Sequence, residues 1–262
     1  MKKQEERDLV QSRLQGDVLR HIVTLKMLRL FGGVIDLRFA QDAQGWALLT
    51  LLPVRVSDFD RRTYPDAESV ALVDGTSDTL KERLLEGLPR VRLVIKTYDE
   101  SVRQFALNRL RASKARSYIS FSRPGGANPG AEPSGIVESG TLVPEIARML
   151  AKNGYFAEEL AGHFSAGARW FAVREGEANI SAGFVFPNFE PVWEIGGLYT
   201  EPDRRRQGHA RSVVAAALGH LAARGSIPRY QVRSDNVESI RLAEAAGLQE
   251  FLRMDHFLAD PG

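Results

Sequence analysis

The chain has 262 residues, of which 44% are hydrophobic and 26% charged, and its formal net charge is +2. This length allows two compact domains, and this balance is typical of a folded globular protein. The small net charge gives no global field that would attract nucleic acid or a membrane surface. The sequence has no cysteine, which excludes disulfides, thiolate metal sites and cysteine nucleophiles.

The N-terminal segment, "MKKQEERDLVQSRLQGDVLRHIVTLKMLRL", begins with basic residues but also carries acids and has no long apolar stretch. It predicts an amphipathic helix over roughly residues 4–30 and not a secretory signal. No window approaches the stretch of about 18 apolar residues that a transmembrane helix needs. We therefore expect no membrane span and a cytoplasmic location.

Strands rich in Val, Ile and Leu alternate with helices in the first half of the chain. Strands are expected at residues 34–40, 45–54, 69–75, 91–97 and 116–122, and helices at 77–88 and 100–112. This alternation predicts an α/β layer structure, and the half carries no chemical motif. Its carboxylate-rich segment "SDFDRRTYPD" is expected to be a solvated loop.

The segment "RPGGANPGAEPSG", residues 123–135, holds three prolines and four glycines and almost no apolar side chains. Such a segment cannot bury enough surface to offset its ordering entropy, so it predicts a flexible linker. The expected organisation is an N-terminal α/β domain at 1–122, the linker at 123–135 and a second domain at 136–262.

The second half again mixes strands and helices. The expected elements are a strand at 135–139, helices at 143–154 and 155–164, a hairpin at 169–186, a strand at 192–200, a helix at 210–225, a strand at 230–236, a helix at 237–247 and a final strand or short hairpin at 248–259. The hairpin carries Trp170, Phe171, Phe184 and Phe186, which we expect in the core.

The stretch "EIGGLYTEPDRRRQGHARSVV", residues 194–214, places three arginines and a glycine at the mouth of a helix. A helix N-terminus exposes unpaired backbone N–H groups and the positive end of the helix dipole, so this loop could cradle a phosphate. It matches neither the ATP-binding P-loop nor the dinucleotide fingerprint. From these residues alone, solvated surface charge and a nucleic-acid contact remain alternatives.

The order of a strand, "LYTEP", Arg205-x-x-Gly208-x-Ala210 and a helix resembles the acetyl-CoA loop of the GNAT superfamily of N-acetyltransferases. "SDNVESIRLAEAAGL", residues 234–248, is similar to the strand–helix unit that follows in that family. The resemblance covers about residues 136–262 and is greatest to two-domain bacterial members with an FR47-like C-terminal domain. It implies the GNAT acyl-CoA N-acyltransferase fold, with a mixed, splayed central sheet. The N-terminal α/β domain would shape the acceptor site or be a degenerate copy of the same fold.

The resemblance also implies acetyl-CoA as the acyl donor and assigns residues to it. Backbone amides of one loop would hold the CoA pyrophosphate; the loop comprises Arg205, Arg206, Gln207, Gly208, His209 and Ala210. The backbone of Leu198, Tyr199 and Thr200 would pair with the pantetheine arm. Asn236 and Ser239 would lie near the thioester or the outer edge of the cofactor, although Asn236 is equally suited to cap a helix.

Glu194 is the candidate general base, because many GNAT enzymes carry a glutamate at this place on the same strand. A rim carboxylate, or one paired with an arginine, is the alternative. Ala243 stands where many family members have a tyrosine that protonates the CoA thiolate. Tyr199, Tyr230 and His256 are the candidate substitutes, unless the thiolate leaves unassisted.

The predicted function is direct transfer, in a ternary complex, of an acetyl group from acetyl-CoA to a primary amine of a small molecule or peptide. A non-catalytic acyl-CoA-binding sensor or scaffold is the alternative. The five histidines show no ligand spacing, so no metal site is expected. Neither nucleic acid nor a membrane is an expected partner. A homodimer is compatible with the sequence, which leaves the acceptor open.

Overall fold

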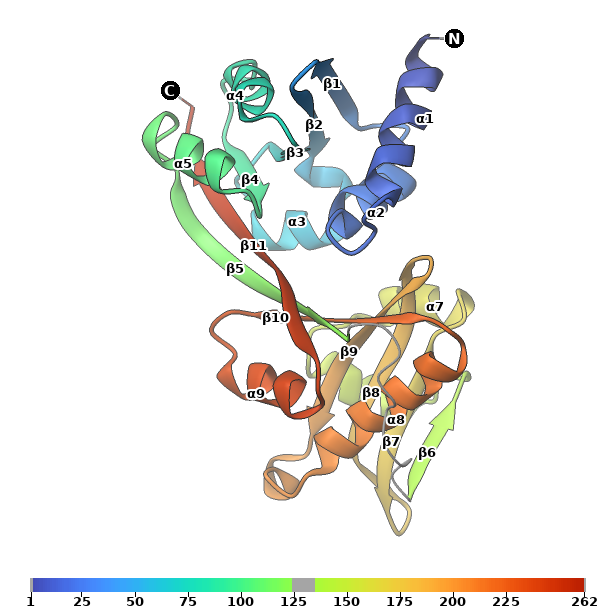
Figure 1. Ribbon diagram of the computed structural model, residues 1–262. Coiled ribbons are helices and arrows are strands. Elements are labelled where there is room, and N and C mark those ends of the chain that lie inside the picture. The colour runs from blue at the N-terminus through green and yellow to red at the C-terminus, as the bar shows by residue number, and fades with distance from the viewer. Residues whose placement is uncertain (1, 124–134, 262) are drawn as a thin grey trace. The chain divides into compact units, whose positions relative to one another are not determined.

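The computed structural model describes residues 2–123 and 135–261 (Figure 1). Contacts divide the chain into two compact units, which we call unit 1 (Met1–Tyr118 and Leu252–Gly262) and unit 2 (Ile119–Phe251). The predicted linker, residues 123–135, lies outside the described residues except for its two ends. Every helix in the described part of the chain is too short or too polar to cross a membrane.

Unit 1 combines a mixed sheet with helices. Its helices are α1 (Lys2–Gln15), α2 (Ile22–Phe31), α3 (Asp58–Thr63), α4 (Asp78–Glu86) and α5 (Glu100–Asn108). Its strands are β1 (Asp36–Asp42), β2 (Gly45–Pro53), β3 (Ser69–Gly75), β4 (Leu93–Thr97) and the parts of β5 (Ser113–Ser122) and β11 (Gln249–Ala259) that fall within the unit. They lie in the order β1-β2-β3-β4-β11-β5. The β3–β4 pair is parallel, whereas β1–β2, β2–β3 and β4–β11 are antiparallel.

Two segments of unit 1 differ from the sequence predictions. The single helix predicted over residues 4–30 is two helices, because Gly16 disfavours helix and the Asp17 side chain accepts the backbone N–H of Arg20 at 3.1 Å. The segment "SDFDRRTYPD", predicted as a solvated loop, contains α3. Asp60 in this helix is buried and accepts a hydrogen bond from Lys96 Nζ at 2.6 Å. A buried charge needs a partner, and this one is supplied by a strand distant in sequence.

Unit 1 also buries two polar clusters that contain histidine. His21 Nδ1 lies 2.5 Å from Asp74 Oδ2 in the first cluster. In the second, Tyr64 Oη lies 2.6 Å from His256 Nδ1. Burial, followed by the charges of Lys96 and a nearby arginine, lowers the pKa of His256 to about 2. His256 is therefore neutral, and its Nδ1 accepts a hydrogen bond from the Tyr64 hydroxyl.

Unit 2 has the same kind of architecture. Its helices are α6 (Pro144–Ala151), α7 (Ala157–Ser165), α8 (His209–Ala223) and α9 (Val237–Ala245). Its strands are β6 (Ile136–Ser139), β7 (Arg169–Glu175), β8 (Ala178–Phe189), β9 (Val192–Thr200), β10 (Ile227–Arg233) and the remaining parts of β5 and β11. The order from β5 is β5-β10-β9-β8-β7-β6, with β9 and β10 parallel and β6 to β9 antiparallel.

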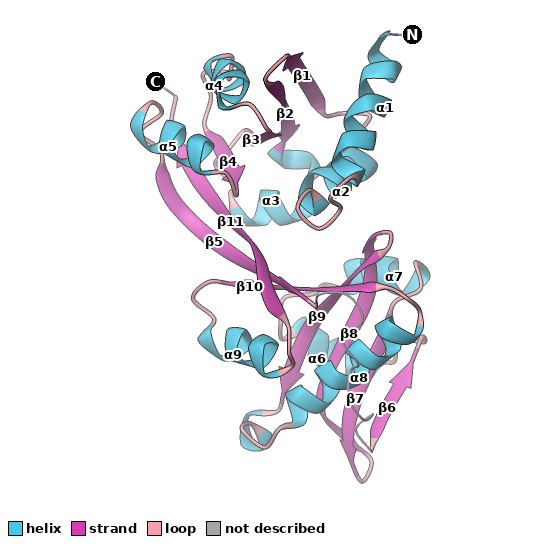
Figure 2. Ribbon diagram, in the orientation of Figure 1, coloured by secondary structure: helices cyan, strands magenta, loops and turns pink. Residues whose placement is uncertain are grey.

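Successive side chains of each strand point to opposite faces of this sheet. Phe171, Trp193 and Ile195 pack with α8 on one face, whereas Trp170 and Phe184 pack with α6 and α7 on the other. Figure 2 shows α8 across the near face and α6 behind the strands. The four hairpin aromatics predicted in the core are buried, and the predicted α/β class with a mixed sheet is confirmed.

The two units repeat one order of elements. Unit 1 runs α1-α2-β1-β2-β3-α4-β4-α5-β5, with α3 inserted after β2, and unit 2 begins with the additional strand β6 and then runs α6-α7-β7-β8-β9-α8-β10-α9-β11. The connections before the helices α4 and α8 differ in length. Only Thr76 and Ser77 separate β3 from α4, whereas residues 201–208 separate β9 from α8. Unit 2 alone has room for a binding loop at this position.

Candidate active site

The loop between β9 and α8 ends in a row of exposed backbone N–H groups. Gly208 is the N-cap of α8 with φ +87°, and Arg206 also has a positive φ of +59°. Among the described residues, no hydrogen bond uses the backbone N–H groups from Arg205 to Arg211. Left-handed residues beside a helix N-terminus create a concave set of N–H donors, which suits an anion.

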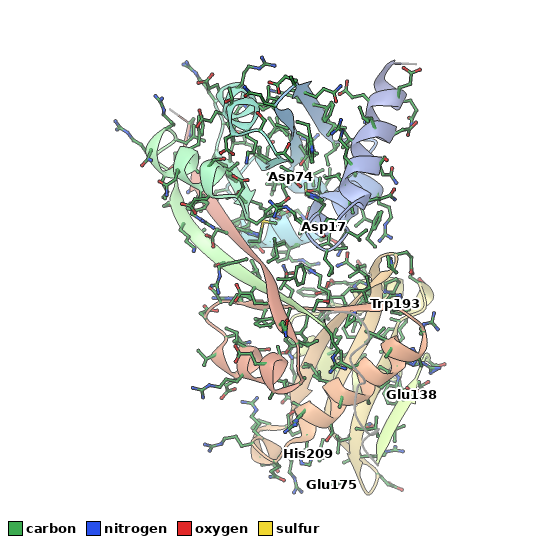
Figure 3. All side chains as sticks on the ribbon, viewed as in Figure 1. Asp17, Asp74, Glu138, Glu175, Trp193 and His209 are labelled. Atoms are coloured by element: carbon green, nitrogen blue, oxygen red, sulfur yellow. The ribbon has the colours of Figure 1, made fainter. Side chains whose placement is uncertain are left out.

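The three arginines before Gly208 have different surroundings. Arg204 Nη2 lies 3.3 Å from Glu175 Oε2, so its charge is already paired within the unit. Arg205 Nε donates to the carbonyl oxygen of Thr200 at 3.2 Å, and its side chain is exposed. Arg206 is exposed as well. Figure 3 shows Glu175 and His209 at one end of unit 2. Arg205 and Arg206 are thus available to a ligand that binds the loop.

Strand β9 leads into this loop and extends beyond its parallel neighbour β10. Its parallel ladder with β10 ends at the Ile195–Tyr230 pair, although β9 continues to Thr200. On its other side, the ladder with β8 shifts register between the Phe184–Gly196 and Ala182–Tyr199 pairs, which leaves Gly197 and Leu198 in a β-bulge. The predicted splay between the two parallel strands is therefore confirmed.

The three residues predicted beside the pantetheine arm lie on this extension of β9. The carbonyl oxygen of Leu198 accepts a hydrogen bond from Asn153 Nδ2, and the Thr200 hydroxyl lies 2.8 Å from the Ser181 hydroxyl. Lys152 Nζ donates to the Tyr199 hydroxyl at 3.0 Å and to Glu201 Oε1 at 3.2 Å, and these two hydrogen bonds raise the pKa of Lys152. The Tyr199 side chain is thus held by Lys152 at the outer part of the strand.

Glu194 lies on the same strand, three residues before the bulge, and is buried in a polar row that crosses the sheet. Its Oε2 accepts hydrogen bonds from Arg229 Nη1 at 2.6 Å and from Asn188 Nδ2 at 2.7 Å. Arg229 Nη2 donates in turn to the Ser120 hydroxyl at 3.0 Å. Among the described residues, nothing hydrogen-bonds Glu194 Oε1. One carboxylate oxygen is therefore fixed, and the other has no hydrogen-bond partner among the described residues.

The start of α9 holds the remaining predicted residues. Asn236 is the N-cap of this helix, and its side chain accepts the backbone N–H of Ser239 at 3.1 Å. The Ser239 hydroxyl lies 2.6 Å from the Tyr230 hydroxyl, and burial raises the pKa of Tyr230. Ala243 is fully buried in the core beneath α8. The helix-cap alternative for Asn236 is realised in the structure.

Sequence reasoning missed Arg229 and Tyr155. Arg229 stands in a strand between apolar neighbours, and an inward-facing charge there signals a buried partner. Tyr155 was predicted inside a helix over residues 155–164, but α7 begins at Ala157. Tyr155 instead lies in the turn after α6, where its ring packs edge-on against Phe184 with centroids 4.9 Å apart.

Comparison with known proteins shows that part of unit 2 is similar to a sequence family. Residues 145–248, which lie in unit 2, match the sequence family described as "Acetyltransferase (GNAT) family". No curated protein matches the sequence.

Solved structures share the fold at low sequence identity. A GCN5-related N-acetyltransferase from Kribbella flavida is 16% identical, with a TM-score of 0.55 over 93% of this chain and 96% of that chain. One from Sphaerobacter thermophilus is 13% identical, with a TM-score of 0.56 over 90% and 84%. A tandem GNAT protein from the clavulanic acid biosynthesis pathway is 14% identical, with a TM-score of 0.52 over 92% and 88%.

Proposed function

Because residues 145–248 match the GNAT acetyltransferase family, we propose that this chain transfers the acetyl group of acetyl-CoA to a primary amine. The observation that carries the proposal is the row of backbone N–H groups from Arg205 to Arg211 at the start of α8, to which no described residue is hydrogen-bonded. The diphosphate of CoA is the anionic part that such a row would hold. Arg205 and Arg206 would add charge-assisted contacts.

The part of β9 that extends beyond its ladder with β10 fits the rest of the donor. Pantetheine carries amide groups that can pair with the backbone of a strand on the side where its neighbour has ended. The residues proposed for this contact are Leu198, Tyr199 and Thr200, which continue β9 beyond its ladder with β10. Gln207, His209 and Ala210 complete the loop, and Asn236 and Ser239 lie at the start of the following helix.

Acetyl-CoA supplies an activated thioester when it is bound, and the chain supplies orientation and proton transfer. Glu194 Oε1 would accept the proton that the amine nitrogen loses as its lone pair forms the new C–N bond. The C–S bond breaks, and its electron pair leaves with the sulfur. Arg229 and Asn188 hold Oε2 and so orient the carboxylate toward the amine. Transfer is direct, because the chain has no cysteine to carry the acyl group.

A non-catalytic acyl-CoA-binding module is the second candidate. It is favoured by Ala243, which is a buried core residue at the place where the resemblance calls for a proton-donating tyrosine. It is also compatible with the ion pair between Glu194 and Arg229, since a paired carboxylate can be purely structural. Both candidates require acetyl-CoA binding, and only the first requires turnover.

Release of CoA thiol tests the proposed function. A thiol reagent reports only CoA in this assay, because the protein has no cysteine of its own. Acetyl-CoA is mixed with the protein and, in turn, with a polyamine, an amino acid, an aminoglycoside and a peptide N-terminus. The proposal expects amine-dependent thiol release with at least one of these acceptors, together with an increase in Tm with acetyl-CoA. An increase in Tm without release across the panel would favour the binding module, and no increase at millimolar acetyl-CoA would contradict both.

A further inference from the structure

Tyr155 is a tyrosine that the predicted site did not include, although it lies beside the bulge of β9. A methyl group at Gly196 would overlap the Tyr155 hydroxyl, which therefore lies directly against the backbone of this strand. Glycine at position 196 leaves the space that the hydroxyl occupies. The close approach fixes the phenol oxygen at the point where β9 loses its pairing with β10.

The ring of Tyr155 is held by its neighbours. Phe184 and Phe186 contact it with centroid separations of 4.9 and 6.4 Å, and His163 lies at 6.4 Å. These contacts come from β8 and α7, so the ring is fixed from two elements. A ring fixed in this way presents its hydroxyl in one position, which is what a catalytic hydrogen-bond donor requires.

The Tyr155 hydroxyl has no hydrogen-bond partner in the part of the chain that the structure describes. The hydroxyls of Tyr64, Tyr199 and Tyr230, by contrast, all have partners. Burial, followed by the negative charge of Glu194, raises the pKa of Tyr155. The phenol therefore keeps its proton and acts as a donor. Glu194 lies two residues before Gly196 on β9 and therefore on the same face of the strand, so the hydroxyl lies in the neighbourhood of the candidate base.

We propose that the Tyr155 hydroxyl donates a hydrogen bond to the carbonyl oxygen of the reacting thioester. This inference rests on the proposed function and adds a donor to it. The carbonyl oxygen gains negative charge as the amine attacks, and a fixed, neutral donor stabilises that charge without reorganisation. Many family members have a tyrosine that protonates the CoA thiolate at the position of Ala243. Tyr155 is not proposed to take over that proton transfer; it only donates a hydrogen bond to the carbonyl oxygen.

Infrared spectroscopy of acetyl-CoA labelled with carbon-13 at the carbonyl tests the proposal without turnover. The hydrogen bond lowers the carbonyl stretching frequency of the bound thioester. Tyr155→Phe is expected to raise that frequency and to weaken acetyl-CoA binding by about fivefold, the loss of one neutral hydrogen bond. Binding of CoA, which has no acetyl carbonyl, should stay within about twofold, because the hydroxyl makes no contact with it.

A second variant, Gly196→Ala, displaces the Tyr155 hydroxyl without replacing the tyrosine. It is expected to raise the carbonyl frequency in the same direction. Ser165→Ala removes an exposed hydroxyl of α7 and serves as the control, with the frequency unchanged.

With an active acceptor, Tyr155→Phe should lower kcat by about 100-fold at an unchanged amine KM.

The outcomes separate this inference from the proposed function. If the wild-type protein binds no acetyl-CoA, the proposed function fails and this inference fails with it. If the wild-type protein binds acetyl-CoA but Tyr155→Phe leaves the carbonyl frequency and the affinity unchanged, only the inference is overturned. An effect confined to the amine KM would also overturn it, because Tyr155 would then contact the acceptor.

Discussion

At the scale of single residues, the pair of Glu194 and Arg229 decides how the site can work. The two side chains are directly opposed in the β9–β10 ladder, and both are buried. An unpaired buried charge is costly, so the pair would persist for structural reasons alone. Both hydrogen bonds use Oε2 of Glu194, and a structural ion pair gives no reason for the other oxygen, Oε1, to be left without a partner among the described residues.

Replacing the carboxylate separates the two roles. Glu194→Gln keeps the shape of the side chain and one acceptor oxygen for Arg229 and Asn188, but it removes the negative charge and the basicity. We expect acetyl transfer to fall by about 100-fold while the Kd for acetyl-CoA stays unchanged, because the lost function is proton transfer. The rate is measured by thiol release at a temperature where the variant is folded.

Glu138→Gln, on the edge strand β6, is the matched control and should keep its rate. An unchanged rate in Glu194→Gln would show that the ion pair with Arg229 is structural and that another group removes the proton.

His256 gives unit 1 a dependence on pH. Its pKa in the folded protein is lowered from 6.5 to about 2, chiefly by burial. The unfolded chain therefore binds one more proton between these values, and the free energy of unfolding falls as the pH drops below about 6.5. Between pH 7 and pH 5 this single residue costs about 2 kcal/mol of stability.

His256→Asn tests this effect, because the Asn side-chain oxygen can still accept the hydrogen bond from Tyr64. Urea unfolding at pH 7 and pH 5 should show a smaller loss of stability in the variant than in the wild type. Equal losses in the two proteins would mean that His256 is not held neutral in the folded state.

At the scale of elements, the connection from β9 into α8 carries the proposed cofactor site. Gly208 begins the helix with φ +87°, and Gly225 follows its end with φ +65°. A Cβ at either glycine would meet open space, so alanine at each position incurs the same kind of left-handed backbone strain. We expect Gly208→Ala and Gly225→Ala each to lower the free energy of unfolding by about 1 kcal/mol.

Only one of these two variants should affect the ligand. Gly208→Ala places a methyl group beside the row of backbone N–H donors and strains its geometry, so its Kd for acetyl-CoA should rise by about tenfold. Gly225→Ala has the same backbone cost at the far end of the helix and should bind normally. Equal affinity in both variants would argue that the pyrophosphate lies elsewhere.

Local sequence patterns predicted most of the elements in both units. The strand before the arginines, the loop and the helix after Gly208 lie where the sequence predicted them, because periodicity and a glycine are local signals. The break between α1 and α2 depends on a weak signal, Gly16–Asp17, inside an otherwise helical pattern.

Contacts between distant segments set the limit of prediction. Asp60 is buried because Lys96, on another strand, pairs with it, and composition alone gives a solvated loop. Glu194 could be named from the family resemblance, but its partner Arg229 depends on strand order. Tyr155 could not be found, because its importance comes from Gly196, which lies beside it only in the folded unit.

At the scale of the whole molecule, two units with one order of elements raise the question of how many cofactor sites the chain has. Unit 1 joins β3 to α4 through Thr76 and Ser77 alone, and the Ser77 side chain accepts the N–H of Leu80 to cap the helix. Unit 2 uses residues 201–208 at the same place. A short, capped turn leaves no loop to surround a diphosphate, so unit 1 is proposed to be a degenerate copy.

Isothermal titration of the full chain with acetyl-CoA tests the central claim most directly. The account predicts one binding site per chain, with the affinity reduced about tenfold in Gly208→Ala and unchanged in Gly225→Ala. The absence of binding would contradict the acetyltransferase proposal, and two sites per chain would contradict the assignment of the cofactor to unit 2 alone.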